Sequence, residues 1–309
     1  MINNSYIKTI ISLIKRKEKM KKTMITLALL TTFASQAAFV SFISDSKYNI
    51  ASDDPAAETG QIVGGGEYVS SEPSTGGGSE PVVVACEGPE LTKRQLQDLI
   101  MSGGDYSKAC ISGITDFSDL FMMRSVNYDI TKWDVSHVTN FASMFSGSSF
   151  NQDISGWDVS SGTDFSFMFS DTANFNQDIS GWNMSNAQTL MNMFAGARKF
   201  NQNISNWNVS NVTHFGNMFQ GTLAFNQDIS GWDVSKSQNF SGMFQYSSVF
   251  DQDISGWNVS SGIYFNNMFK AANSFNQDIS GWDVSASSSW YDFNFASSLA
   301  SENIPAKFR

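Results

Sequence analysis

The stretch 151-NQDISGWDVSSGTDFSFMFSDTANF-175 is followed at once by a second version of itself, 176-NQDISGWNMSNAQTLMNMFAGARKF-200. The register is set by seven tryptophans: Trp133, Trp157, Trp182, Trp207, Trp232, Trp257 and Trp282. The first interval between them is 24 residues and every later one is 25. A fixed period of this size is typical of architectures in which each copy packs only on its neighbours.

Each copy repeats the same apolar residues at the same distances from Trp. Ile stands three residues before it, Val (once Met184) two after it, and a Met-Phe pair eleven and twelve after it. An eighth copy, which matches the pattern only in part, begins upstream at Asp105. The pattern ends after Trp290. Because one copy cannot bury its own apolar side, we expect each Ile, Trp, Met and Phe to pack on its counterpart in the next copy.

The spacing of these residues predicts the fold class. Ile-x-x-Trp-x-Val alternates with polar residues, which indicates a strand. Segments such as 212-VTHFGNMF-219 space apolar residues by three and four, which indicates a short helical or 3-10 turn. Residues 105–290 are therefore predicted to form an α/β, leucine-rich-repeat-like repeat solenoid of about eight stacked coils, each with one short parallel strand and one such turn.

Both ends of such a stack need covering. Thr92 and Gln95 match a capping box, so residues 86–104 are predicted to form an N-terminal helical cap. The apolar residues that share one face of this predicted helix are Leu91, Leu96, Leu99 and Ile100. Residues 291–309 are expected to be a C-terminal cap or tail.

The chain that precedes the cap divides into two parts. The run MKKTMITLALLTTFASQA from Met20 has a basic start, a short apolar stretch and small residues before a cleavage point after Ala37. This pattern predicts an N-terminal export signal in residues 1–37 and a protein at the cell surface or outside the cell. The true start, Met1 or Met20, stays open. Residues 38–85, rich in Gly, Ser and acidic residues, are expected to be a flexible acidic linker.

The charge balance bears on partners. The formal net charge is −10, and residues 1–37 hold seven Lys/Arg against one acidic residue, so the remainder has 12 basic and 28 acidic residues. So acidic a body repels nucleic acid and anionic lipid. We expect no nucleic-acid partner, and no membrane insertion after the signal is removed.

The chain contains two cysteines, Cys86 and Cys110. In an exported protein, a pair of cysteines predicts one disulfide, here between the cap and the first copy. A reactive thiol pair is the alternative, but the two residues lack the CxxC spacing that would favour it.

Two polar columns flank the Ile and Trp residues. Stacked oxygen-bearing side chains could bind Ca²⁺ between copies. The alternative is that they accept hydrogen bonds from turn amides, which the occasional Asn favours because it keeps the acceptor and loses the charge. The first column is Asp129, Asp153, Asp178, Asn203, Asp228, Asp253 and Asp278, and the second is Asp134, Asp158, Asn183, Asn208, Asp233, Asn258 and Asp283.

Two further columns are interpreted as scaffold. The residue before Trp is almost always glycine, which predicts a positive φ or a close backbone approach; the column is Gly156, Gly181, Asn206, Gly231, Gly256 and Gly281. A glutamine column is predicted to form a ladder of side-chain amides: Gln152, Gln177, Gln202, Gln227, Gln252 and Gln277.

The sequence offers few residues in arrangements typical of a catalytic site. The histidines are His137 and His214, three repeats apart in different columns and without a cysteine at ligand spacing. Nothing marks a Ser–His–Asp arrangement among the many Ser and Asp residues. We predict no catalytic residue, no metal site and no cofactor, and therefore no enzyme. The Trp column is interpreted as core and not as a carbohydrate-stacking surface, since each Trp lies between Ile and Val.

Repeats of the form FNQDISGWDVSxVTxFxxMF resemble those of the BspA-like leucine-rich-repeat surface proteins, the bacterial family described by the DUF285 repeat. The resemblance covers about residues 105–290 and implies an exported or surface-displayed protein, with a role in adhesion or host contact in some members. The general leucine-rich consensus has a ladder of asparagines in one column. This chain has no asparagine in that column, which is Val138, Gly162, Ala187, Val212, Ser237, Gly262 and Ser287.

The columns that vary from copy to copy are the remaining candidates for a binding surface. One is His137, Ser161, Asn186, Asn211, Lys236, Ser261 and Ala286, and another is Asn140, Asp164, Thr189, His214, Asn239, Tyr264 and Ser289. Our first hypothesis is an exported, non-enzymatic surface or secreted protein whose solenoid binds a protein or glycan partner, as in adhesion. The alternatives are a structural spacer or assembly module and a calcium-dependent glycan-binding module. The ligand and the oligomeric state stay open.

Overall fold

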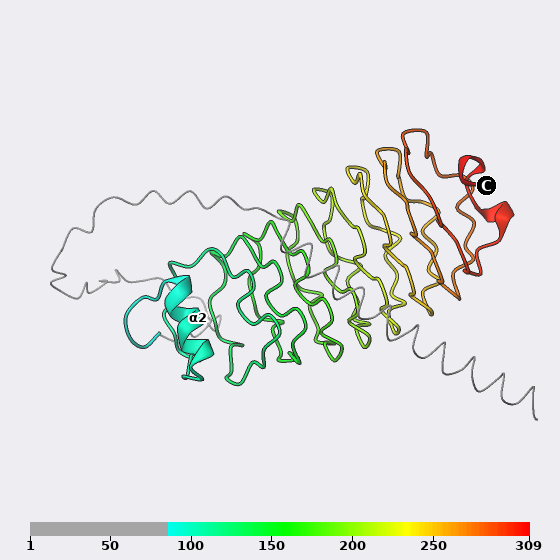
Figure 1. The fold of residues 1–309 in the computed structure, drawn as a ribbon. Helices are drawn as coiled ribbons and strands as arrows, with labels where there is room; N and C mark the ends of the chain where they lie inside the picture. Colours follow the sequence, from blue (N-terminus) through cyan, green and yellow to red (C-terminus); the bar gives the residue numbers. More distant parts are fainter. Residues whose placement is uncertain (1–85) are drawn as a thin grey trace, which may run out of the picture. The chain divides into compact units, whose positions relative to one another are not determined.

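The computed structural model describes residues 86–309 (Figure 1). The predicted export signal (1–37) and linker (38–85) lie outside the described residues. The helical elements in the described part are α2 (Lys93–Met101) and two 3-10 helices, η1 (Ser301–Asn303) and η2 (Ala306–Phe308). Between α2 and η1 the copies follow one another in chain order along the unit (Figure 1). Among the residues described, no helix is long and apolar enough to cross a bilayer.

Consecutive copies are joined by isolated parallel β-bridges. Each bridge links the residue seven after Trp to its counterpart in the next copy, from Asp116↔Asn140 to Tyr264↔Ser289. Beyond each bridge, N–H groups at positions 8, 10, 12 and 14 after Trp donate to carbonyl oxygens of the next copy, and we call these bonds the turn ladder. In the copy of Trp207 the bonds are 2.8–3.0 Å long and join Phe215 to Asn239, Asn217 to Ser241, Phe219 to Met243 and Gly221 to Gln245.

The turn-ladder segment consists of consecutive β-turns. The N–H of Met218 donates to the Phe215 carbonyl at 3.0 Å, and Thr222 donates to Phe219 in the same way at 3.2 Å. The residues 10 and 14 after Trp have φ between 52° and 71° in all eight copies, and twelve of these sixteen are not glycine. A left-handed residue at every fourth position is incompatible with a helix.

This backbone differs from the predicted strand and helical turn. The bridges lie beyond the Ile-x-x-Trp-x-Val segment, and the apolar spacing of three and four belongs to turns. The physical reason is that every second N–H of this segment bonds to the next copy and is unavailable for a helix. Consecutive turns still bring apolar residues to one side, so they produce the same spacing.

The recurring apolar side chains form one continuous buried core. The seven aligned tryptophans are 3–6 % exposed. Phenylalanines twelve after Trp stack on their counterparts; the rings of Phe194 and Phe219, for example, are 5.9 Å apart and inclined by 8°. Phe194 also stacks on Phe200, which closes the same copy, at 3.9 Å. Offset stacking of this kind adds to the burial of apolar area.

Each indole also makes a hydrogen bond to the preceding copy. The Nε1–H of Trp207 donates to the Ile179 carbonyl at 3.0 Å. The same bond is made by every other aligned Trp from Trp157 to Trp282, at 3.1–3.2 Å. A buried N–H without an acceptor would be costly. The Trp column therefore combines packing with a specific polar contact, and the rings are not available for stacking on a sugar.

A ladder of asparagines, with Asp251 in one place, follows the closing Phe of the copies, in a different column from the general leucine-rich consensus. The Asn151 Oδ1 accepts the N–H of Asn176 at 3.0 Å, and Asn176 accepts that of Asn201 at 2.9 Å. Gln227 donates to the Asn201 Oδ1 at 2.9 Å, and Gln252 makes the equivalent bond to Asn226. The predicted glutamine amide ladder is therefore wrong, because Gln227 and Gln252 bond to the asparagine column of the preceding copy, and Gln152 bonds to backbone of the preceding copy.

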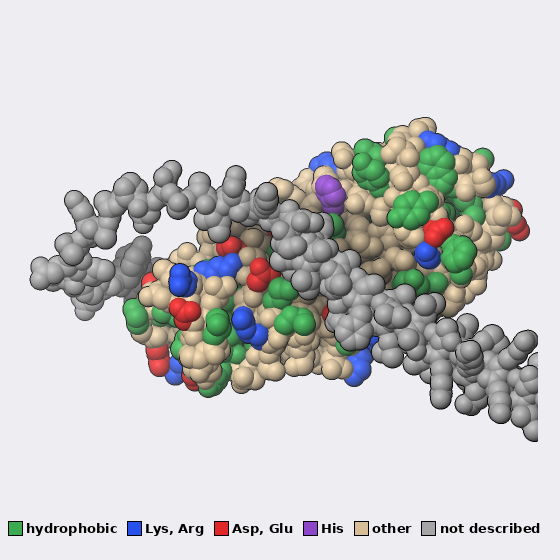
Figure 2. Space-filling view, viewed as in Figure 1, with side chains coloured by type: hydrophobic (Ala, Val, Ile, Leu, Met, Phe, Trp, Pro, Cys, Tyr) green, Lys and Arg blue, Asp and Glu red, His purple; other side chains and the backbone are tan. Residues whose placement is uncertain are grey.

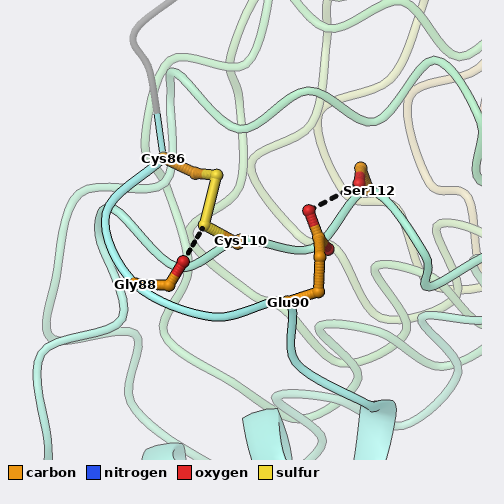
Figure 3. The surroundings of a disulfide bond; sticks show 5 residues. All are labelled: Cys86, Gly88, Glu90, Cys110 and Ser112. Atoms are coloured by element: carbon orange, nitrogen blue, oxygen red, sulfur yellow. Dashed lines mark hydrogen bonds between the residues drawn. A yellow bond between two sulfur atoms is a disulfide. The ribbon is translucent and has the colours of Figure 1, made fainter. Parts of the chain in front are cut away.

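At the N-terminal end, residues 86–104 pack on the first copy. Thr92 and Gln95 form a capping box at the start of α2, and Leu96 and Ile100 are buried. Figure 3 shows the disulfide that joins Cys86 to Cys110, whose Cα atoms are 4.9 Å apart. Beside it, Glu90 bridges to Cys110 in parallel and accepts a 2.7 Å hydrogen bond from the Ser112 hydroxyl.

At the C-terminal end, residues 291–309 pack on the last copy. The Phe308 ring is 5.3 Å from Trp290 and 5.3 Å from Phe265, so it lies where a further copy would stack. The Lys307 ammonium donates to the carbonyl oxygens of Val284, Ser285 and Ser287 at 2.7–3.1 Å. The apolar end of the stack and several terminal carbonyls are thereby covered.

The glycine column before Trp has neither of the properties predicted for it. None of these glycines has a positive φ, and a Cβ added to any of them would meet nothing within 4 Å. Asn206, in the same column, also lacks a positive φ. The prediction is wrong because this position lies in an open turn, whereas the left-handed positions fall in the turn ladder.

We expect Gly221→Ala to destabilise the protein by about 1–2 kcal/mol, because Gly221 has a φ of 65° and an L side chain is disfavoured there. The added Cβ would approach nothing closer than the Gly196 nitrogen at 4.0 Å, so the change tests conformation alone. Gly256→Ala is the matched control, with a negative φ and open space. Equal urea midpoints for the two variants would contradict this assignment.

Opening the disulfide should lower stability by roughly 3–4 kcal/mol on the chain-entropy estimate, since the bond closes a loop with a sequence separation of 24. The measurement is urea unfolding of the wild type with and without a phosphine reductant. Cys86→Ser, which cannot form the bond, is the control and should not respond to the reductant. A wild-type midpoint that does not change on reduction would count against a stabilising bond.

Candidate functional site

Large apolar side chains are rarely exposed in the described residues, so the exceptions identify a candidate site. Two exposed methionines, Met101 and Met123, lie near the N-terminal end. The other exposed large apolar residues all belong to the last four copies: Leu223, Tyr246, Val249, Tyr264, Tyr291 and Phe295. Figure 2 shows apolar side chains gathered on this part of the surface, with charged side chains between them.

Four of these residues are aromatic, and three of them, Tyr246, Tyr291 and Phe295, lie near a lysine, Lys270. We define the aromatic patch as Tyr246, Tyr264, Lys270, Tyr291, Asp292 and Phe295. The four rings are between 46 % and 64 % exposed, whereas the aromatic columns of the core are almost fully buried. The patch is therefore a distinct surface, formed where side chains of the last three copies meet.

The turn ladder holds the patch together. Tyr246 donates its N–H to the Lys270 carbonyl at 2.8 Å, and Ala271 donates to the Phe295 carbonyl at 2.9 Å. Tyr264 bridges to Ser289, two residues before Tyr291. Patch residues distant in sequence are thus neighbours across adjacent copies, and their spacing is fixed by backbone bonds.

The Lys270 ammonium contacts two other members of the patch. Its Nζ is 2.7 Å from an Asp292 carboxylate oxygen and 5.4 Å from the centre of the Phe295 ring. The hydrogen bond to Asp292 raises the pKa of Lys270, and the tyrosines at 246 and 291 add to this effect. A cation held against an aromatic ring can take part in cation–π and polar contacts with a ligand.

One member of the patch, Tyr264, belongs to a column predicted to be variable, and the structure places that column at the β-bridges. The remaining patch residues lie in columns for which the sequence carried no prediction. A signal was present, because Tyr246 and Phe295 are large aromatic residues where other copies carry small or polar ones, apart from a methionine in the first copy.

The other predicted variable column lies at the surface without forming a cluster. Asn211 donates to the Ser185 carbonyl at 2.8 Å and accepts from Lys236 at 2.6 Å. His137 is 2.9 Å from the Ile111 carbonyl oxygen, and His214 is 2.8 Å from the hydroxyl of its neighbour Thr213. His137 thus contacts the preceding copy and His214 contacts its neighbour in the chain, and the structure does not bring the two histidines together.

Both acidic columns bond to the backbone two residues ahead. Asp178 accepts the N–H of Ser180 at 2.9 Å, and Asn203 accepts that of Ser205 at 3.0 Å. In the second column Asp233 accepts from Ser235 at 3.1 Å. Bonds from Ser180 hold the pKa of Asp178 below its usual range, and most aspartates of both columns behave in the same way. One oxygen of each side chain is thus already used inside its own turn.

A hollow of about 310 Å³ lies between the cap and the first copy, and Glu87, Leu91, Leu99, Lys108 and Cys110 are among its lining residues. Glu87 and Lys108 form an ion pair at its edge, at 2.7 Å. Cys86, Glu90 and Cys110 lie close enough to share a metal ion, but the disulfide occupies both sulfurs. This hollow therefore offers less for recognition than the aromatic patch does.

Comparison with protein families gives one match. The family described as Mycoplasma protein of unknown function, DUF285, matches residues 101–207 and 188–306, which together span more than half of the chain. No curated protein matches the chain, and no solved structure matches it.

Asp178→Asn should leave the thermal midpoint near the wild-type value, because Asn203 fills the same position and accepts the same bond. Asp178→Ala should lower it, since the Ser180 N–H then loses its acceptor. Millimolar Ca²⁺ should not change the wild-type midpoint. A Ca²⁺-dependent rise that Asp178→Asn abolishes would favour the metal-binding alternative.

Acid should destabilise the folded chain through these columns. A carboxyl whose folded pKa lies below its unfolded value contributes stability above the unfolded pKa and loses it as pH falls through the folded one. Asp129, Asp253 and Asp278 all have lowered pKa values. We expect the free energy of unfolding to fall as pH drops through and below the ordinary Asp pKa of about 4. A free energy that stays constant across this window would contradict the hydrogen-bond assignment.

Proposed function

This chain belongs to the DUF285 family, and on that basis we propose that it is an exported, non-enzymatic surface or secreted protein that binds a protein or glycan partner through the aromatic patch. We also propose that residues 105–290 form a leucine-rich-repeat-like solenoid of the BspA-like kind. The parallel bridges between equivalent residues of consecutive copies support this fold.

The observation that carries the binding proposal is the contrast between the patch and the remaining surface. Most apolar columns are buried, and the polar columns bond to backbone within and between copies. The patch instead exposes four aromatic rings beside an ion pair. Exposed aromatic residues close together are characteristic of interaction surfaces, and tyrosines are frequent among residues that dominate binding energy.

Export and the non-enzymatic role rest on the sequence. The basic and apolar run in residues 1–37 supports export, and two isolated histidines supply little for acid–base catalysis. The excess of acidic residues in the remaining chain favours a protein or glycan partner over nucleic acid.

The two alternatives have less support. A passive spacer would not need exposed aromatic residues. A calcium-dependent glycan-binding module would need side-chain oxygens that the acidic columns already direct to turn amides. The aromatic patch therefore favours partner binding over both.

The test is binding of the purified mature chain to candidate host cells and to arrays of glycans and matrix proteins. The patch variant combines Tyr246→Ala, Tyr264→Ala, Tyr291→Ala and Phe295→Ala. Because residues of this kind dominate interface energies, we expect it to lose affinity at least about tenfold.

The matched control removes exposed apolar side chains from the other end, as Met101→Ala with Met123→Ala. It should bind like the wild type. Wild-type binding by the patch variant, or an equal loss in both variants, would reject the patch as the binding site.

A further inference from the structure

The turn ladder has an open end in the last copy. In every earlier copy, N–H groups 8, 10, 12 and 14 after Trp donate to carbonyl oxygens of the copy that follows. The corresponding donors of the copy of Trp282 have no acceptor among residues 86–309: Trp290, Asp292, Asn294 and Ala296. We call these four N–H groups the open edge.

The C-terminal cap covers other parts of the last copy. Phe308 stacks on Trp290, and Lys307 bonds to the carbonyls of residues 284–287. Asn303 accepts the Ile279 N–H at 3.0 Å, and Asn276 accepts that of Ala300 at 2.8 Å. The cap thus closes the core and the asparagine ladder, and residues 297–309 supply no acceptor to the turn-ladder donors.

Exposed residues of the aromatic patch lie within the open edge. Asp292 is one of its donors, and Tyr291 and Phe295 lie between donors. The Tyr291 and Phe295 side chains are 64 % and 61 % exposed. An edge with unpaired backbone donors is a template for pairing with another chain. Here the template also has aromatic side chains that can contact the residues of whatever pairs with it.

The spacing of the donors identifies the chemistry of the partner. At the seven copy–copy contacts within the chain, the same donor positions are filled by carbonyl oxygens of every second residue of a polypeptide. The open edge continues that interface without change of register. A polypeptide backbone supplies carbonyls at this interval, as it does when a peptide segment adds to an exposed edge.

We propose that the open edge of the last copy is a docking site for a polypeptide segment of another protein, which adds its backbone carbonyls to the turn ladder and packs its side chains on Tyr291 and Phe295. The inference rests on the proposed function and deepens it, because it names a protein as the partner class and adds backbone pairing to the aromatic patch.

A second copy of the chain is less suited to this site. The carbonyls that would fill it belong to the first copy, where α2 packs. Lys93 of that helix is 3.0 Å from the Asp116 carboxylate and donates to the Ser118 hydroxyl at 2.7 Å. The disulfide that joins the cap to the first copy holds this arrangement in place. Head-to-tail pairing would have to displace the cap, whereas a segment of another protein would not.

The probe for the test is a synthetic peptide with the sequence of residues 239–246, NFSGMFQY, which fills the equivalent donors of the copy of Trp207. Hydrogen–deuterium exchange is measured on the mature chain with and without it. In the free chain, amides of 290–296 should exchange faster than those of 265–271, which are paired. The peptide should slow exchange in 290–296, and a scrambled peptide of the same composition should not.

A pair of variants isolates the backbone contribution. Asn294→Pro removes one donor N–H and should weaken peptide binding about two- to tenfold, the effect of one hydrogen bond. Asn294→Ala keeps that N–H and should bind like the wild type; both variants lose the side-chain bond to the Leu299 carbonyl. If Asn294→Pro does not fold, the exchange measurement on the wild type decides.

Several results would overturn the proposal. Absence of protection in 290–296 up to the solubility limit of the peptide would do so, as would equal losses in Asn294→Pro and Asn294→Ala. Dimerisation of the free chain in sedimentation that Asn294→Pro abolishes would identify a second copy as the occupant. If the patch variant loses cell binding while the peptide gives no protection, the proposed function stands and the open edge is rejected.

Discussion

The contact between one copy and the next is the interaction on which this structure depends. A single 25-residue copy cannot bury its own apolar side chains. It becomes stable only when a neighbouring copy covers them. The indole of each Trp shows how specific the contact is: its ring packs in the core while its N–H bonds to the Ile carbonyl of the preceding copy. Replacing a copy with generic apolar residues would keep burial and lose this bond. The same dependence explains why both ends carry caps, since the first and last copies each lack one neighbour.

The buried columns could be predicted from the sequence, because burial selects the same apolar side chain in every copy. The backbone pairing could not, because a backbone hydrogen bond does not require a particular side chain. The left-handed positions are filled by residues as different as Asp119, Phe167 and Ala271, so no glycine signal identifies them. The glycine column suggested such a position where the structure has an ordinary open turn. The asparagine ladder lay unnoticed beside the glutamine column because a recurring Asn after Phe resembles any polar turn residue.

The candidate site illustrates the same limit at the surface. Its tyrosines and phenylalanine differ from the repeat pattern, and departures from a pattern carry more functional information than agreement with it. Their proximity could not be predicted, because it depends on which columns the turn ladder brings side by side. Lys270 provides an example: in sequence it lies 22 residues from Asp292, and in space the two are ion-paired.

The disulfide at the junction of the cap and the first copy has a mechanical consequence. Residues 87–109, with α2 among them, lie inside the covalent ring that Cys86 and Cys110 close. A pull applied to the chain ahead of Cys86, and resisted anywhere in the repeats, therefore passes through the sulfur–sulfur bond directly to the first copy. The helix lies beside that path and not along it, so tension does not stretch it or peel it from the copy that it protects. A chain held at its amino end against a flow would thus keep its cap in place.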